Sequence, residues 1–355
     1  MIKEQHIEFC LTEQEFKDTF SLFIGDAKSL LIVHGHKSYQ SCGAMRLINE
    51  LTMNIDVVDF DDFTENPKMA DVEKGVSLLR QTDPNVIVAI GGGSTLDMAK
   101  LIRHYSHHNL QLIAIPTTAG TGAESTQFAV CYLDGIKHSI SDEAIIPDKV
   151  LLYPPFTYNN NRYLTSCTGF DALAQAIEAY WNINSTFESD SYALRAIRLI
   201  YPMLIKDILS PSDRAFLMKG ANEAGKAINI TRTTVPHALS YTLTSKYGYP
   251  HGHAVALTFP FFLKYYLDGK ETEYMGSDYR QYVTKMNRLR EELGLGKDPF
   301  LAMKDYIKRL GLQYDPLRAF DDVVVASGIN LERAKNSPMK IDEGVIMAAI
   351  QSIRE

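Results

Sequence analysis

Cysteine is scarce in this sequence, and its placement argues against two kinds of site. The four cysteines lie far apart along the chain; they are Cys10, Cys42, Cys131 and Cys167. A thiolate zinc site needs closely paired cysteines, and a disulfide framework is typical of short, cysteine-rich secreted chains. The composition therefore fits a reducing compartment, and we expect a cytoplasmic protein.

Long apolar runs and an excess of positive charge are also absent. No stretch reaches about 18 consecutive apolar residues, and the N-terminal segment lacks the apolar core of a signal peptide. The formal net charge is -7, whereas binding to nucleic-acid phosphates needs a basic surface. We therefore expect neither a membrane nor a nucleic acid as partner. The net charge does not exclude a local basic pocket for a small anion.

The chain is long enough for two hydrophobic cores. Its 355 residues, 45% of them apolar and 22% charged, predict a globular protein of two domains. In the first part, helical patterns separate short β-branched runs, which lie at 29–35, 55–60, 85–93 and 110–118. This alternation predicts a parallel sheet covered by helices on both faces.

The strand pattern stops near residue 160. Just before it, residues 127–141 hold two alternating runs around an Asp-Gly turn, which predict a β-hairpin. Long amphipathic patterns follow, at 168–182, 188–209, 212–229 and 273–293. The sequence therefore predicts an α/β domain over residues 1–160 and an all-α domain over residues 161–355.

A glycine-rich turn ends the third apolar run, with Gly91, Gly92 and Gly93 in succession. Ser94 follows at the expected start of a helix, and Ser94 with Asp97 has the spacing of a capping box. Glycine lets the backbone approach a phosphate closely, and a helix N-terminus attracts negative charge. A tight turn without ligand is the alternative, but three glycines are entropically costly for a turn alone. We expect a dinucleotide pyrophosphate here, although the G-x-G-x-x-G fingerprint is absent.

A second polar loop follows the next apolar run, at residues 115–125. It offers the hydroxyl groups of Thr117, Thr118 and Thr121, interspersed with glycines. Ligands of open α/β sheets bind at the carboxyl ends of parallel strands. We therefore expect both loops to contact the nucleotide.

The helical part holds side chains suited to a metal ion. Asp171, Gln175 and Glu178 are spaced i, i+4 and i+7, on one face of a helix. Downstream, His237 and His251 add two imidazoles. A carboxylate with two imidazoles suits a divalent transition metal with an open position. Taken one at a time, a helix cap for Asp171 and a structural role for each histidine are the simpler interpretations.

Several motifs, taken together and in order, resemble those of the iron-containing (group III) metal-dependent alcohol dehydrogenases. They are Asn66-Pro67, GGGSTLDMAK (91–100), PTTAGTGAE (116–124), Pro147-Asp148, GFDALAQAIEAY (169–180), HALSY (237–241) and PHGHAVA (250–256). The resemblance implies a dehydroquinate synthase-like architecture, in which a nucleotide-binding α/β domain precedes a helical metal- and substrate-binding domain. It also implies NAD or NADP and Fe²⁺ or Zn²⁺ as cofactors. The implied metal ligands are Asp171, Gln175, His237 and His251.

Two positions depart from that family's pattern. The family usually has His where Gln175 stands, and an amide oxygen is a weaker ligand than imidazole, so the identity of the metal is open. The histidine that usually follows the first histidine ligand by four residues is Tyr241 here. Tyr241 and His253 are the candidates for the catalytic proton donor. His253 lies two residues from His251 on an expected helix, so it is expected to point elsewhere.

The turn after the first apolar run bears on the choice of nucleotide. Many NAD-dependent members of the family carry an Asp here that holds the ribose hydroxyls, whereas this chain reads HGHKS at residues 34–38. Lys37 and Ser38, with His36 as a further candidate, are therefore expected to accept a 2'-phosphate, and NADPH is expected over NADH. A solvated surface lysine is the alternative. The expected cofactor contacts are Gly35, Lys37, Ser38, Asn66, Gly91, Gly92, Gly93, Ser94, Asp97, Thr117, Thr118, Thr121 and Lys137.

The segment just before His237 bears on the charge of the substrate. Relatives that act on neutral alcohols tend to have small and apolar residues there, whereas residues 231–234 read TRTT. An arginine flanked by hydroxyl groups suits an anionic group, so Arg232, Thr233 and Thr234 are the expected anion contacts. Pairing of Arg232 with a nearby glutamate, Glu223 or Glu178, is the alternative.

Together with Gln175 and residues 181–186, this segment resembles the branch of the family that reduces phosphonoacetaldehyde to 2-hydroxyethylphosphonate. The sequence thus predicts NAD(P)H-dependent, metal-assisted reduction of a small anionic aldehyde. Three alternatives stay open: a dehydrogenase for neutral short-chain alcohols, a sugar-phosphate cyclase of the dehydroquinate synthase type, and a nucleotide-binding regulator whose metal site has decayed. A small molecule is the expected substrate. The sequence does not decide between a monomer and a homodimer.

Overall fold

The computed structural model describes residues 4–64, 67–133 and 136–355, which form two compact units. The first unit comprises residues 1–160 with 210–218, and the second comprises residues 161–209 with 219–355. The segment 210–218 belongs to the first unit because Met218 packs with Val150 and Leu152 of its sheet.

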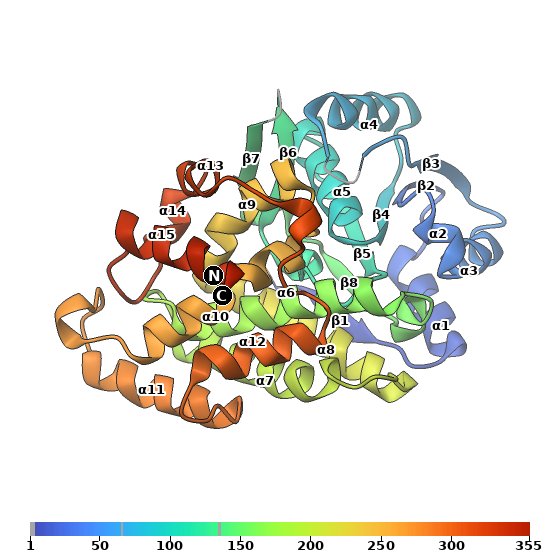
Figure 1. The fold of residues 1–355 in the computed structure, drawn as a ribbon. Coiled ribbons are helices and arrows are strands. Elements are labelled where there is room, and N and C mark those ends of the chain that lie inside the picture. Colours follow the sequence, from blue (N-terminus) through green and yellow to red (C-terminus); the bar gives the residue numbers. More distant parts are fainter. Residues whose placement is uncertain (1–3, 65–66, 134–135) are drawn as a thin grey trace. The chain divides into compact units, whose positions relative to one another are not determined.

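A six-stranded parallel sheet forms the centre of the first unit (Figure 1), with the order β1-β8-β5-β4-β2-β3. Its strands are β1 (His6–Phe9), β2 (Ser29–His34), β3 (Asp56–Phe60), β4 (Val86–Gly91), β5 (Gln111–Pro116) and β8 (Lys149–Leu152). The four strands expected from the sequence are β2 to β5, and they are adjacent in the sheet. Strands β1 and β8 were not predicted, because four residues are too few to establish a period.

Helices cover both faces of this sheet, as expected. They are α1 (Glu13–Ile24), α2 (Ser38–Ser41), α3 (Ala44–Leu51), α4 (Met69–Thr82) and α5 (Gly93–Ser106). Buried residues of α1 and α3 pack against one face of the sheet, and those of α4 and α5 pack against the other. Strands β2, β4 and β5 therefore read as nearly continuous apolar runs, since successive side chains enter two different cores.

The predicted hairpin is present as β6 (Phe128–Leu133) and β7 (Ile136–Ser141), paired antiparallel. A fully buried lysine of α5 fastens its base. Lys100 Nζ donates hydrogen bonds to the carbonyl oxygens of Thr126 and Phe128, at 2.8 and 2.9 Å. Short 3-10 turns complete this unit at η1 (Ala123–Ser125), η2 (Glu143–Ile145) and η3 (Pro154–Thr157).

From residue 161 onward the described chain is helical and contains no strand, as the sequence predicted. The helices are α6 (Arg162–Trp181), α7 (Phe187–Leu204), α8 (Pro211–Thr231), α9 (Val235–Tyr247), α10 (His251–Leu267), α11 (Tyr279–Glu292), α12 (Pro299–Arg309), α13 (Asp322–Ser327), α14 (Leu331–Ala334) and α15 (Glu343–Gln351), with turns η4 (Glu271–Glu273), η5 (Pro316–Arg318) and η6 (Ser352–Arg354). The amphipathic patterns correspond to α6, α7, α8 and α11. Helices α9 and α10 gave no such pattern, because most of their residues are buried all round. Within the described residues, no helix has both the length and the apolarity needed to cross a membrane.

Helix α6 is the central helix of the second unit, and residues 169–181 are all buried. Polar side chains on such a helix need partners, because an unpaired buried polar group is costly. The partners of Asp171, Gln175 and Glu178 define the candidate site.

Candidate functional site

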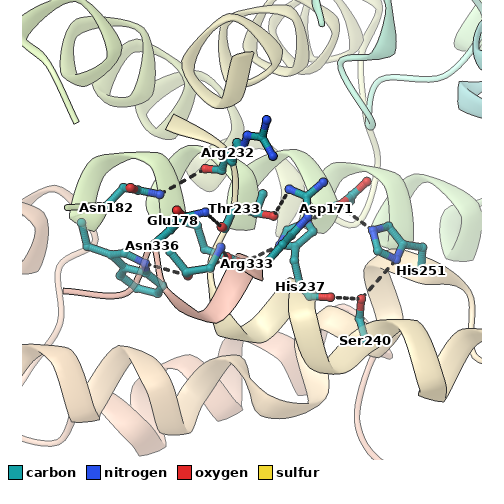
Figure 2. Close-up of polar contacts among 12 residues, drawn as sticks. Asp171, Glu178, Asn182, Arg232, Thr233, His237, Ser240, His251, Arg333 and Asn336 are labelled. Carbon is teal, nitrogen blue, oxygen red and sulfur yellow. Dashed lines mark hydrogen bonds and ion pairs between the residues drawn. The ribbon is translucent and has the colours of Figure 1, made fainter. Parts of the chain in front are cut away.

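Asp171 in α6 meets the imidazoles of His237 in α9 and His251 in α10 (Figure 2). One potential ligand atom from each of the three lies within 4.8 Å of the others. Asp171 Oδ1 lies 3.1 Å from His237 Nε2 and 3.9 Å from His251 Nε2. Asp171 and His237 are buried, whereas the His251 side chain is 36% exposed. This donor set fits a divalent transition metal with one side open to a substrate.

Helix α10 begins against α6 because residue 252 is glycine. A Cβ at Gly252 would overlap the carbonyl oxygen of Cys167 and lie 3.1 Å from the Cβ of Asp171. The preceding residue, His251, can therefore reach Asp171. Ser240 of α9 contacts the other nitrogen of that ring, with 3.3 Å between its Oγ and His251 Nδ1.

The carboxylate of Glu178 holds the His237 ring from the opposite side. It is fully buried, and its Oε1 lies 2.5 Å from His237 Nδ1. Its Oε2 accepts hydrogen bonds from the backbone N–H and the hydroxyl of Thr234, at 2.5 and 2.7 Å. An Nδ1–H donated to Glu178 leaves Nε2 directed at Asp171, the arrangement that metal-binding histidines usually have. The sequence placed Glu178 on the face of Asp171 and offered it only as a partner for Arg232, not as a group that holds a metal ligand; the seven-residue spacing was the signal for this second role.

Charges and burial act in opposite directions on this group. Burial lowers the pKa of His237, but Glu178 and Asp171 outweigh it and raise that pKa to about 9. Burial raises the pKa of Asp171, but His251, His237 and Gln175 together lower it below its ordinary value. Gln175 is hydrogen-bonded to the Asp171 carboxylate and thereby orients it. Coordination of a metal by Gln175 stays a prediction.

The two candidate proton donors occupy different surroundings. Tyr241 follows His237 by one turn of α9, and its ring lies nearly parallel to that of His251, with centroids 6.1 Å apart. His253 is turned away, as expected: its Nδ1 lies 2.9 Å from the Tyr163 hydroxyl and its Nε2 lies 2.9 Å from the carbonyl oxygen of Gln313. The structure therefore brings Tyr241, but not His253, to the Asp171 group.

Arg232 is exposed and adopts a left-handed backbone conformation, with φ of 64°. In Figure 2 its guanidinium group points away from Asp171 and His237. Glu223, one suggested ion-pair partner of Arg232, pairs with Arg195 at 2.7 Å. Glu178, the other, bonds His237 as described.

The two threonines that follow Arg232 are tied into the protein by their hydroxyl groups. Thr233 Oγ1 accepts a hydrogen bond from Arg333 Nη1 at 2.8 Å. Thr234 Oγ1 donates to Glu178 and accepts from Trp181 Nε1 at 3.0 Å. These hydroxyls hold the segment in place, and their contact with a substrate anion stays a prediction. Arg333 had no signal in the sequence, since it lies almost a hundred residues downstream.

In the first unit, the helix after the glycine turn begins earlier than expected. Helix α5 starts at Gly93, and its N-cap is Gly92. The expected capping box is therefore wrong: Ser94 lies inside the helix, and Asp97 Oδ2 accepts a hydrogen bond from the backbone N–H of Val130, at 3.1 Å. Asp97 thus binds the hairpin instead of the helix start.

The two polar loops lie side by side at the carboxyl ends of β4 and β5. A Cβ at Gly93 would lie only 2.7 Å from Cγ2 of Thr121, so glycine is needed there for the loops to meet. Backbone N–H groups at the start of the 14-residue α5 fit a pyrophosphate. The other close pairs between the loops are Gly91 with Thr117 and Gly92 with Thr118.

The turn expected to bind the ribose carries both signs of charge. Lys37 is exposed, and Ser38 begins α2 and packs beneath Gly35. A carboxylate that the turn itself lacks comes from the residue that follows β3: His36 Nδ1 lies 2.7 Å from Asp61 Oδ2.

Two other expected cofactor contacts cannot be placed in this way. Asn66 lies outside the described residues, and Lys137 is described only as part of the backbone of β7.

Comparison with known families agrees with this arrangement over most of the chain. The model of iron-containing alcohol dehydrogenases matches residues 13–154, and the model of the C-terminal region of the Fe-containing alcohol dehydrogenase family matches residues 165–315. The chain belongs to the iron-containing alcohol dehydrogenase family.

Individual relatives are named for different activities. The chain is 31% identical over 228 residues to long-chain-alcohol dehydrogenase 1 of Geobacillus thermodenitrificans, covering 58% of each chain. It is 32% identical over 217 residues to phosphonoacetaldehyde reductase of Streptomyces viridochromogenes, covering 53% of this chain and 54% of the relative. The chain thus spans little more than half the length of these curated relatives.

The fold matches more completely. The solved structure of an iron-containing alcohol dehydrogenase from Thermotoga maritima has a TM-score of 0.83 at 27% identity, covering 98% of this chain and 97% of that one. The expected fold class, a parallel α/β part followed by a helical part, is confirmed.

Proposed function

We propose that this protein is a metal-dependent oxidoreductase that reduces a small aldehyde to its alcohol with a nicotinamide nucleotide. The observation that carries the proposal is the buried convergence of Asp171, His237 and His251, with Glu178 behind His237. Fe²⁺ or Zn²⁺ in this donor set would supply a Lewis acid for the carbonyl oxygen, and the nicotinamide would supply hydride.

The chain's own residues have distinct roles in this proposal. Asp171, His237 and His251 hold the ion, while Gln175 and Glu178 fix the ligands that they contact. Tyr241 is the candidate to pass a proton to the product oxygen. Burial is the largest influence on its pKa and raises it, so Tyr241 keeps its proton at neutral pH. The loops around Gly91–Gly93 and Thr117–Thr121 hold the pyrophosphate.

We further propose a small anionic aldehyde, phosphonoacetaldehyde, as substrate and NADPH as cofactor. The similarity to a phosphonoacetaldehyde reductase supports the substrate, and so does Arg333, which bonds Thr233 near the site. The exposed Lys37 at the ribose turn supports NADPH. Replacement Lys37→Ala should lower kcat/KM for NADPH relative to NADH about tenfold, as expected for one charge-assisted contact. An unchanged ratio would remove Lys37 from the cofactor site.

The deciding experiment follows nicotinamide absorbance after the protein is loaded with Fe²⁺ or Zn²⁺. Phosphonoacetaldehyde and butyraldehyde are compared, each with NADPH and with NADH. We expect the highest kcat/KM for phosphonoacetaldehyde. A preference for butyraldehyde would indicate a dehydrogenase for neutral alcohols. Absence of nicotinamide turnover with every aldehyde would reject the oxidoreductase and favour a cyclase or a regulator.

A further inference from the structure

A short segment after α13, residues 330–336, is fastened to the start of the helix that carries His237. The backbone N–H of Asn330 donates to the carbonyl oxygen of Ala238 at 3.4 Å. The side chain of Asn336 donates to the carbonyl oxygen of Thr233 at 2.9 Å. Helix α14 between these two contacts is a single turn, so its position depends on them.

Arg333 reaches from this turn toward the candidate site (Figure 2). Its Nη1 donates to Thr233 Oγ1 at 2.8 Å, and its side chain is only partly exposed. Thr233 is followed by Thr234, which donates two hydrogen bonds to Glu178. The guanidinium group therefore bonds the residue next to Thr234, whose hydrogen bonds hold Glu178 against the His237 ring.

The charge of Arg333 also extends to the substrate side of the site. Burial raises the pKa of the Tyr241 phenol, whereas Arg333 acts to lower it. Tyr241 lies along the ring of His251, the ligand candidate that is open to solvent. The positive charge of Arg333 thus reaches the exposed side of the donor set.

The charges of the metal site do not offset the negative charge of an anionic substrate, so such a substrate needs a further cation. A divalent ion held by Asp171 and two neutral imidazoles would be formally balanced by the carboxylates of Asp171 and of Glu178, which bonds His237. A phosphonate that enters this partly buried region would bring negative charge that the set itself does not offset, and unpaired charge is costly to bury. Arg232, the cation expected from the sequence, points away.

We propose that Arg333, rather than Arg232, binds the phosphonate group of the substrate, so that residues 330–336 determine the preference for anionic aldehydes. This inference rests on the proposed function. A guanidinium group can hold two phosphonate oxygens at once, a geometry that a lysine ammonium cannot reproduce.

The test combines a binding measurement with a ratio of rates. Methylphosphonate binding is measured by calorimetry on metal-loaded protein without aldehyde. The ratio of kcat/KM for phosphonoacetaldehyde to that for butyraldehyde is measured in parallel. We expect Arg333→Ala to lower the ratio about ten- to hundredfold and to weaken methylphosphonate binding at least about tenfold. Arg333→Lys should recover only part of the loss.

Matched variants distinguish binding of the phosphonate by Arg333 from a structural role of Arg333 in residues 330–336. Lys335 is exposed, lies two residues after Arg333 and pairs with Glu332. Lys335→Ala therefore removes a nearby positive charge and should leave both measurements as in wild type. Asn336→Ala removes a hydrogen bond that fastens the segment, the one to the carbonyl oxygen of Thr233, but keeps the charge of Arg333, so it should preserve the ratio. An Asn336→Ala protein that loses the ratio as fully as Arg333→Ala would mean that Arg333 only supports the segment, and would overturn the proposal.

Other outcomes are equally decisive. Selective loss in Arg232→Ala instead of Arg333→Ala would return the anion site to Arg232. Aldehyde reduction by a wild type that does not bind methylphosphonate would reject the anion site and keep the reductase. Methylphosphonate binding that depends on Arg333, in a protein that reduces no aldehyde, would keep the anion site and reject the reductase.

Discussion

At the scale of the residue, Glu178 influences the metal centre without being one of its expected ligands. Its carboxylate fixes one ring nitrogen of His237, and loss of such a partner commonly weakens metal binding. We predict that Glu178→Gln lowers the affinity for Zn²⁺ about 10- to 100-fold, measured by competition with a chelator. Nucleotide binding serves as control, since the glycine loops belong to the other unit. Equal zinc affinity in variant and wild type would reduce Glu178 to a packing role.

Gln175 offers a second test at the same scale. It stands where the family usually has histidine, and it hydrogen-bonds Asp171. We predict that Gln175→His raises metal affinity, because imidazole is a better donor than an amide oxygen for Fe²⁺ and Zn²⁺. Metal content after dialysis against a chelator measures the effect. Equal retention of every metal tested would mean that residue 175 acts on Asp171 alone.

At the scale of the element, the crossing of α6 and α10 depends on a single missing side chain. We predict that Gly252→Ala lowers the free energy of unfolding by at least about 3 kcal/mol, because the added methyl group would overlap the backbone of Cys167. Metal retention should fall with it, since His251 would move from Asp171. Thermal unfolding and metal content are the measurements. Gly296→Ala is the matched control, because a Cβ there meets open space; a Gly252→Ala protein as stable as this control would contradict the close approach.

The junction of α5 with the hairpin predicts a dependence of stability on pH. Burial lowers the pKa of Lys100 from 10.5 to about 8 in the folded protein, against the opposing influence of Asp97 and Glu124. Between these two values the unfolded chain binds more protons than the folded one, so the contribution of Lys100 to the free energy of unfolding rises with pH, by at most about 1.4 kcal/mol per unit. Below that window the charged lysine destabilises the fold.

Urea unfolding of wild type and Lys100→Met at either end of this window isolates the effect. The difference between the two proteins should grow in favour of wild type as pH rises, which removes the contributions of the tyrosines and cysteines common to both. A difference that is independent of pH would mean that Lys100 keeps its proton throughout.

At the scale of the whole molecule, features that depend on neighbouring residues in the sequence could be predicted. Features that depend on contacts between distant segments could not. Strands β2, β4 and β5 could be predicted because burial on both faces leaves uninterrupted apolar runs. The start of α5 could not, since Gly92 caps the helix without a side chain, and Asp97 binds Val130 of the hairpin instead of completing a capping box with Ser94. Asp171, His237 and His251 emerged only when several motifs were combined, because each alone has a simpler structural explanation. Arg333 could not be predicted, since long-range hydrogen bonds to Thr233 and Ala238 fix its segment.

Helix α8 makes the two compact units inseparable as modules. Its first residues belong to the unit of the sheet, where Arg214 donates to the carbonyl oxygens of Thr157 and Asn160, and its remaining residues belong to the helical unit. The chain therefore passes between the units three times. A chimera made with one crossover at residue 160 would replace Met218, which packs against Val150 and Leu152, by its counterpart from a relative. Residues 210–218 therefore have to be exchanged together with residues 1–160 if this part of the core is to keep its own partners.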